Sequence, residues 1–284
     1  MAKKATSEAA AKDPKPKRLK LVHAPWHGIV YCDPMGGKST MLATLAKEDG
    51  PICVWCFDGR GKDMPYWKVG RPQRVGETKL PKDEWGTPYR EVWYPERDEV
   101  MVRIEYYQDP IIESPEAYSR FIDRLSHAQK ELHLYRGFVL DSVTSTSLLG
   151  RKWSQYELQD TAKDPRKWYA EATDLLEEVL MAQLPAMPCH VGVACHIART
   201  KVEAEGTMVR TPLAPGRLAA AMASQWPEMY RIYVDHDKGG NKRRYLQTDS
   251  DEKWQAGTQM GLPDPCKPTF KAIWAEGRGA VEGG

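Results

Sequence analysis

The stretch HGIVYCDPMGGKSTMLATLAKE, residues 27–48, decides the fold. It starts as an apolar run rich in β-branched and aromatic residues, passes through a Gly/Pro cluster and ends in a helix-forming segment. PICVWCF (51–57) is a second strand of the buried type, closed by Asp58 and Gly59. A strand, a helix and a second strand at this spacing predict a parallel sheet with a right-handed crossover. We therefore expect an α/β fold with a mainly parallel central sheet flanked by helices.

The Gly/Pro cluster has the composition of a phosphate-binding loop. In such a loop, glycines let successive backbone N–H groups surround a phosphate, a lysine reaches its outer oxygens, and a hydroxyl holds Mg²⁺. Cys32 stands where the motif usually has its first glycine. The residues expected to bind the nucleotide follow it: Asp33, Pro34, Met35, Gly36, Gly37, Lys38, Ser39 and Thr40. The alternative interpretation is a Gly-Gly turn beside a solvated lysine.

A second anchor for the metal lies at the end of another apolar strand, GFVLDS (137–142). The carboxylate of Asp141 at this position can meet the Mg²⁺ that also touches Ser39. An aspartate that only caps a turn is the alternative. The next residue is Ser142 rather than a glutamate, so the group that activates water has to come from another element.

Asp58 and Glu105 are the carboxylates available for that role, because each lies on or after a neighbouring strand. We prefer Asp58, whose alternative role is an Asp-Gly turn. His196 ends the strand CHVGVACH (189–196) and is expected to sense the γ-phosphate and relay its presence to the following loop. A histidine bonded only to backbone is the alternative. The predicted catalytic residues are thus Lys38, Asp58, Asp141 and His196.

Composition limits the class of protein. The 41 Lys and Arg residues against 39 Asp and Glu residues give a net charge of +2, so any basic surface for nucleic acid must be local. The six cysteines follow no disulfide spacing, and a reducing cytoplasm, the host cytoplasm if a phage encodes the chain, is the expected compartment. Cys53 and Cys56 should point to opposite faces of a strand, so we expect no zinc site there. No apolar run is long enough to span a membrane.

The chain divides into three expected regions. Residues 1–20 are a Lys/Ala/Pro-rich segment expected to be a disordered basic arm, 21–265 form the core, and 266–284 are a loosely packed C-terminal extension. Residues of about 60–100 are polar without a sustained period and are interpreted as an insertion.

Within the core, a strand at 101–108 precedes a helix that we expect to open at Ser114 and Pro115. Residues 144–163 show no apolar period, and Asp164 with Pro165 starts the next helix. A charged loop follows the strand at 189–196 and leads to a short Ala-rich helix. MYRIYVDH and RRYLQT flank DKGGNK and predict a C-terminal antiparallel hairpin.

These motifs together resemble a phage-type RecA-like NTPase family, whose better-known members act as single-strand annealing recombinases. The similarity rests on VYCDPMGGKSTML, CVWCFDG, GFVLDSVTS, VACHIART, APGRLAAAMASQWPEMYRI and WQAGTQMGLP. It implies a RecA-like fold, ATP and Mg²⁺ as cofactors, and a homo-oligomeric ring or filament in which a neighbour's arginine completes the site. Single-stranded DNA and other replication or recombination proteins are the implied partners, and no membrane is involved.

In RecA-like proteins the segments after the Asp141 and His196 strands line the nucleic-acid channel. The corresponding basic and aromatic residues here are Arg151, Lys152, Trp153, Arg199, Lys201 and Arg210. Charged surface loops are the alternative, because acidic residues are interspersed. Lys242, Arg243 and Arg244 form another basic cluster, which is either functional or only solubilising.

The leading hypothesis is an ATP-dependent protein that binds and anneals single-stranded DNA. A non-hydrolysing, nucleotide-gated scaffold is the first alternative, since Cys32 departs from the motif and no glutamate follows Asp141. A P-loop kinase for a small metabolite is the second, but it would need an Arg-rich lid that the sequence does not display.

Overall fold

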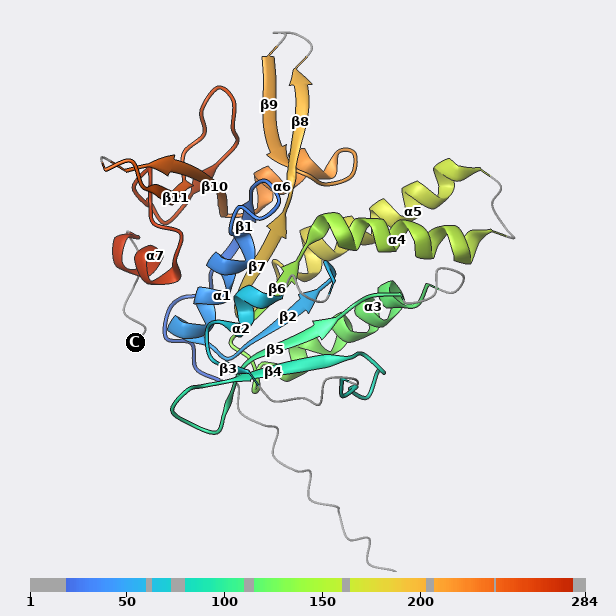
Figure 1. Ribbon diagram of the computed structural model, residues 1–284. Helices are drawn as coiled ribbons and strands as arrows, with labels where there is room; N and C mark the ends of the chain where they lie inside the picture. The colour runs from blue at the N-terminus through green and yellow to red at the C-terminus, as the bar shows by residue number, and fades with distance from the viewer. Residues whose placement is uncertain are drawn as a thin grey trace, which may run out of the picture.

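Apolar runs of the sequence form the strands of one large sheet. The computed structural model describes residues 19–59, 63–72, 80–109, 115–159, 164–202, 207–237 and 239–277. In this part of the chain the strands follow the order β11-β10-β1-β7-β6-β2-β5-β4-β3, and β12 pairs with β10 (Figure 1). The parallel strands are β1 (His27–Tyr31), β2 (Ile52–Cys56), β5 (Val100–Tyr106), β6 (Gly137–Asp141), β7 (His190–Cys195) and β10 (Glu228–His236). The antiparallel ones are β3 (Arg71–Pro72), β4 (Tyr89–Trp93), β11 (Lys242–Gln247) and β12 (Gly257–Thr258).

Helices cover both faces of the sheet. One face carries α1 (Lys38–Asp49), α2 (Met64–Trp67) and α7 (Phe270–Glu276). The other carries α3 (Ala117–Ala128), α4 (Val143–Leu158), α5 (Pro165–Glu178) and α6 (Leu218–Gln225), with a 3₁₀ turn at Gln129–Glu131 and a π turn at Val179–Gln183. Cys53 and Cys56 point into opposite layers, as the sequence predicts. No described helix combines the length and apolarity needed to cross a membrane.

The strand order places the nucleotide motifs at one edge of the sheet. Strand β7 lies between β1 and β6, and all three are parallel. The glycine loop after β1, Asp58 after β2, Asp141 at the end of β6 and His196 after β7 therefore meet at the carboxyl edge, where parallel α/β sheets bind ligands. The expected α/β class, the mainly parallel central sheet flanked by helices and the antiparallel pair β10–β11 are confirmed.

Most of residues 144–163, for which the sequence showed no period, form the long helix α4. Its buried positions are Val143, Thr146, Gly150 and Ser154, which recur at helical spacing but are mostly small or polar. A Cβ at Gly150 would lie only 3.0 Å from the Tyr118 ring, so this helix packs closely through small side chains. A hydrophobic period is absent for that reason, although the helix is present.

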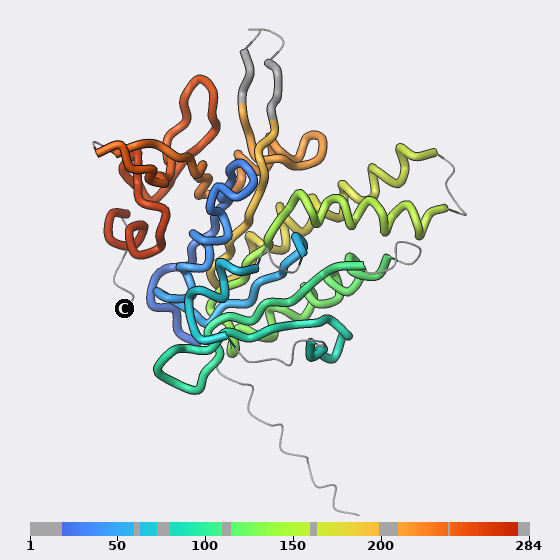
Figure 2. The backbone as a smooth tube through the Cα atoms, viewed as in Figure 1, coloured from blue at the N-terminus to red at the C-terminus, as the bar shows by residue number. Residues whose placement is uncertain are grey.

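The charged loop expected after His196 is instead a hairpin of β8 (Ile197–Val202) and β9 (Thr207–Pro212). Residues such as Thr200 and Val209 pair across it and favour an extended backbone. The hairpin extends away from the body of the sheet (Figures 1 and 2). The sequence did not predict these strands because the many charged residues of the segment leave no apolar alternation.

Other helix boundaries and the ends of the core were predicted with mixed success. Helix α3 begins at Ala117, where the Asp109 carboxylate accepts backbone N–H groups at 2.7 and 2.9 Å, so the expected start at Pro115 is wrong; Ser114 lies outside the described residues. The Asp164 cap of α5 is confirmed.

Phe270 is fully buried with its ring edge-on to Trp26, so the prediction of loose packing is wrong for residues 266–277. Residues 1–18 and 278–284 lie outside the described part.

Candidate nucleotide-binding site

The loop between β1 and α1 has the backbone of a phosphate cradle. Gly37 has φ +117°, which favours glycine, and Met35 also has positive φ at 63°. A Cβ at Gly36 would lie 2.4 Å from the Cys32 Sγ atom, so only glycine fits above the cysteine that replaces the first motif glycine. The loop leads into the N-terminus of the 12-residue helix α1, whose free N–H groups and dipole attract an anion.

Lys38 lies beneath this loop and is almost fully buried. Its Nζ atom donates to the Cys32 carbonyl at 3.4 Å and is 3.8 Å from the Cys32 Sγ atom. It also lies 3.4 Å from Nδ1 of His196. Because an ammonium group only donates, Nδ1 must accept, and the ring proton then resides on Nε2. The lysine charge is thus held at the edge of the cradle by one backbone group and one ring nitrogen.

Ser39 and Asp141 meet as the sequence predicts. The Ser39 hydroxyl hydrogen-bonds the Asp141 carboxylate, which is 4% exposed. Burial raises the pKa of Asp141, while hydrogen bonds from Ser39 and Tyr66 partly oppose this rise. Adjacent hydroxyl and carboxylate oxygens are hard donors of the type that Mg²⁺ prefers. Because Mg²⁺ usually takes only one or two protein ligands beside substrate phosphates and water, this pair fits such an ion.

Asp58 faces the same space from the end of β2. One of its oxygens accepts hydrogen bonds from the hydroxyls of Ser142, at 2.9 Å, and Ser145. The other lies 3.9 Å from Nε2 of His196. His196 therefore stands between Lys38 and Asp58, and its backbone N–H contacts the Thr144 hydroxyl at 3.4 Å. The Asp-Gly turn, which was the alternative role of Asp58, is also formed at this position, since Gly59 has φ +96°.

Glu105, the other carboxylate considered for water activation, does not belong to the site. It is fully buried and accepts hydrogen bonds from Arg124 at 3.0 and 3.1 Å, Arg103 at 2.9 Å and Tyr107 at 3.0 Å. Its side chain lies within the layer of α3, away from the glycine loop. Glu105 is an ion-pair residue of the core.

The grouped residues surround a cavity of about 410 Å³. Its lining consists of Pro34, Met35, Gly37, Lys38, Ser39, Thr40, Asp58, Pro65 and His196. Asp141 lies behind Ser39, while Asp33 and Gly36 close the turn through a 3.0 Å backbone hydrogen bond. A cavity of this size falls in the range of small-molecule and cofactor sites. The structure therefore assembles the predicted nucleotide residues around one space.

Sequence reasoning missed residues that reach the site from the flanking additions to the sheet. Tyr66 and Pro65 come from α2, within the segment interpreted as an insertion. Arg244 comes from β11, and its Nε atom donates to the Gly36 carbonyl at 3.0 Å. The basic cluster at 242–244 was noted in the sequence, but only the pairing of β10 with β11 places one member on the phosphate loop.

The residues predicted to contact DNA lie on helix α4 and on the β8–β9 hairpin. Arg151 and Lys152 are exposed on α4, whereas Trp153 packs against Tyr118 with ring centroids 5.7 Å apart. Arg199 and Lys201 are on β8, with side chains outside the described part. Arg210 on β9 lies over the Trp254 ring at 4.7 Å, and Arg231 lies 3.3 Å from the same ring. The aromatic ring next to these cations is therefore Trp254, which the sequence analysis did not select.

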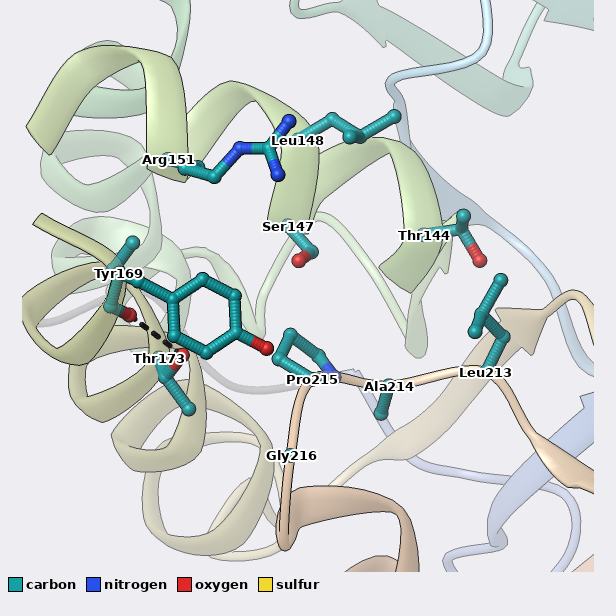
Figure 3. Close-up of a pocket in the computed structure, with 11 residues that line it drawn as sticks. Thr144, Ser147, Leu148, Arg151, Tyr169, Thr173, Leu213, Ala214, Pro215 and Gly216 are labelled. Atoms are coloured by element: carbon teal, nitrogen blue, oxygen red, sulfur yellow. Dashed lines mark hydrogen bonds between the residues drawn. The ribbon is translucent and has the colours of Figure 1, made fainter. Parts of the chain in front are cut away.

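Arg151 also lines a second cavity of about 290 Å³, shown in Figure 3. Thr144, Ser147 and Arg151 on α4 line one side, Tyr169 on α5 lies at the end near Arg151, and Leu213 at the end near Thr144 belongs to the loop Leu213–Gly216 (Figure 3). Pro215 and Gly216 thus form a wall of this cavity. The first turn of α4 contacts Asp58 through Ser145 and lines this second cavity through Thr144.

A glycine cradle, its lysine, and a serine–aspartate pair at the ends of parallel strands define a P-loop nucleotide-binding domain. Residues 24–260 match the model of a family described as an AAA domain, and the chain belongs to this family of P-loop NTPases. No curated protein matches the sequence.

A solved structure described as a prototypical ATPase from the type III secretion system of pathogenic bacteria is similar, with a TM-score of 0.41 and 10% identity. The similar region covers 81% of this chain and 65% of that one, so this chain spans less than two thirds of that protein's length.

Proposed function

We propose that the protein binds ATP with Mg²⁺ and hydrolyses it. The observation that carries this proposal is the convergence of Lys38, the Ser39–Asp141 pair and Asp58 on one cavity. Lys38 supplies the positive charge that stabilises the outer phosphate oxygens as charge develops on them. Ser39 and Asp141 hold Mg²⁺, which neutralises phosphate charge when it is bound.

Asp58 is proposed as the group that orients water and accepts its proton. The Ser142 and Ser145 hydroxyls fix one of its oxygens, which leaves the other free to face the cavity beside His196. The water oxygen attacks the γ-phosphorus, the bond to the β,γ-bridging oxygen breaks, and the water proton passes to Asp58. His196 touches both Lys38 and the Asp58 side and so responds to an occupied γ-phosphate position.

Steady-state ATP hydrolysis by wild type and Lys38→Ala tests this proposal. Lys47→Ala is the matched control, because Lys47 is exposed at the other end of the same helix. We expect Lys38→Ala to lose turnover by a factor of about 10²–10³, the usual effect of removing one charge-stabilising donor, and Lys47→Ala to keep it. Nucleotide binding without turnover in wild type would favour a nucleotide-gated scaffold. Phosphate transferred to a small molecule would favour a kinase.

We also propose that single-stranded DNA is the partner that this ATPase binds and anneals. Exposed Arg151 and Lys152 on α4, the hairpin residues Arg199 and Lys201, and Arg210 beside Trp254 support contacts to phosphates and a base. The connection through α4, from Arg151 to Ser145 and Asp58, supports stimulation of hydrolysis by DNA.

Measuring hydrolysis with and without single-stranded DNA at two salt concentrations tests this partner. We expect stimulation that weakens with salt and disappears in Lys38→Ala. An unchanged rate with DNA, together with no binding in a fluorescence anisotropy assay at low salt, would contradict it.

A homo-oligomeric ring or filament is proposed as the working assembly, in which an arginine of a neighbouring copy completes the charge around the γ-phosphate. The exposed Met35 beside the cavity, with 95% of its surface accessible, supports a site that faces a partner copy. Sedimentation with and without ATP and DNA measures this; a monomer under all conditions would contradict the proposal.

A further inference from the structure

Helix α2 is a short element held firmly over the nucleotide site. The buried Asp63 carboxylate, just before the helix, accepts a hydrogen bond from the Tyr106 hydroxyl on β5. The Asp63 carbonyl accepts the Tyr66 backbone N–H at 2.9 Å, and the Trp67 ring lies 4.3 Å from the Arg90 guanidinium on β4. Contacts from β5 and β4 therefore fix the position of α2.

The attachment of α2 places Tyr66 against Asp141. The tyrosine side chain is fully buried, and its hydroxyl donates to Oδ2 of Asp141 at 2.8 Å. The Ser39 hydroxyl is within hydrogen-bonding reach of both the tyrosine oxygen and Asp141, and its single proton can be donated to either. Residues from three distant segments thus form one closed hydrogen-bonded group.

We propose that Tyr66 is a positioning residue for Mg²⁺, acting by fixing the rotation of the Asp141 carboxylate. A carboxylate held at one oxygen presents the other in a defined direction, and partners of metal ligands raise metal affinity in this way. The inference rests on the proposed nucleotide-dependent function and adds a role for residues 63–67, which the phosphate-loop motif does not include. Pro65 of the same helix lines the cavity, so α2 both walls the site and orients its acid.

A purely structural role for Tyr66 predicts something different. In that case the hydroxyl only satisfies a buried carboxylate, and its removal lowers stability without a selective effect on the metal. A positioning role predicts weaker Mg²⁺ binding while the affinity for metal-free ATP stays constant. The two affinities can be measured separately, so the roles are distinguishable.

The test compares Tyr66→Phe with Tyr118→Phe in the full chain. Tyr118 is also buried, and its hydroxyl has no hydrogen-bond partner among the described residues, so the control removes the same atom from a buried tyrosine without breaking a hydrogen bond. A fluorescent ATP analogue reports nucleotide affinity in EDTA, and a Mg²⁺ titration of the loaded protein reports metal affinity. The Mg²⁺ dependence of hydrolysis is measured alongside.

We expect Tyr66→Phe to raise the half-saturating Mg²⁺ concentration about tenfold, as loss of such a partner typically does, with ATP affinity in EDTA changed less than twofold. Tyr118→Phe should match wild type in both. Asp63→Asn, which loosens α2 without touching the site, should raise the Mg²⁺ requirement by a smaller factor and serves if Tyr66→Phe folds poorly.

Unchanged Mg²⁺ affinity in Tyr66→Phe, with wild-type ATP binding, would overturn this inference alone. Failure of the wild-type protein to bind the ATP analogue would overturn the proposed function and the inference with it. An equal loss of Mg²⁺ affinity in Tyr118→Phe would show that the effect is not specific to Asp141 and would also overturn it.

Discussion

Asp58 and Glu105 come from neighbouring strand segments of the sheet and have different surroundings. Asp58 follows β2, and Glu105 is on the adjacent strand β5, paired in register with Trp55. Both carboxylates accept several hydrogen bonds, and a cationic or ring nitrogen stands near each. Asp58 borders a cavity of about 410 Å³, whereas Glu105 is enclosed on all sides by the α3 layer. Whether a carboxylate borders a cavity, more than the number of its hydrogen-bond partners, therefore distinguishes a candidate site residue from an ion-pair residue of the core.

The partners of the two groups explain how each environment is maintained. Neutral hydroxyls hold Asp58, so its charge remains available to a water or to His196. Arg124 and Arg103 neutralise Glu105, and Glu131 engages Arg124 at 2.6 Å to complete a closed network. A buried charge needs such pairing because desolvation is costly. The comparison therefore predicts effects on turnover at one position and on stability at the other.

The largest effect is expected from Asp58→Asn. The amide keeps the shape and accepts the Ser142 hydroxyl but cannot take a proton from water. General-base catalysis contributes a factor of about 10²–10⁴, so kcat should fall by that order while ATP affinity and thermal stability remain near wild type. Single-turnover hydrolysis and ATP binding, measured on the same preparation, check this. A kcat within threefold of wild type would place the base elsewhere and break the comparison.

Glu105→Gln should show the opposite result. The substitution leaves the Arg124 guanidinium buried with less than its full charge compensation. Breaking a buried ion pair in this way typically costs about 3–5 kcal/mol. We expect a fall of that size in the free energy of unfolding from urea titrations, with kcat per folded molecule unchanged. Substantial loss of turnover in fully folded protein would return Glu105 to the catalytic candidates.

The same pair shows how much the sequence could predict. The phosphate loop was predictable because its residues are contiguous, and Asp141 and His196 because parallel strands end at one edge. The sequence analysis preferred Asp58 but kept Glu105 as a candidate, since the enclosing Arg124 comes from a helix whose packing no local pattern specifies. Tyr66 and Arg244 reach the loop only through tertiary contacts made by added elements. Helix α4 was missed because its buried face is formed by small and polar side chains.

The buried carboxylate of Asp49 belongs with Glu105 in this comparison and allows a test with pH. Burial alone would raise its pKa, but hydrogen bonds from His190 and from the backbone N–H groups of Val22 and His23 outweigh it and lower the pKa. A pKa lower in the folded than in the unfolded chain means that the charged form stabilises the fold. That contribution is present above the unfolded value, about 3.9, and is lost as pH falls through the folded value.

Asp49→Asn should therefore cost about 1.5–3 kcal/mol near pH 7, the usual range for hydrogen bonds to a charged group, and progressively less below pH 4. Urea unfolding of wild type and variant at several pH values between 7 and 3 measures the difference. Turnover per folded molecule should not change, because Asp49 ends α1 at the far end from Lys38. A constant difference at all pH values would show that charge is not the source of the stability.

The smallest effect is expected where water already surrounds the charge, at Arg151. Its guanidinium is exposed beside the cavity between α4 and α5, so its removal leaves no buried partner and should not change stability (Figure 3). Loss of one phosphate contact should weaken single-stranded DNA binding by about three- to tenfold and reduce the slope of log affinity against log salt by about 0.7. Fluorescence anisotropy across a salt series measures both, with Arg97→Gln as the control because Arg97 is exposed in the β4–β5 connection, away from α4. Equal weakening in both variants would mean that net charge alone attracts the DNA, whereas a lower salt slope in Arg151→Gln alone would assign a phosphate to this side chain. The second result would show that the exposed charge of Arg151 binds a partner, unlike the charge of Arg124, which pairs with Glu105 inside the core.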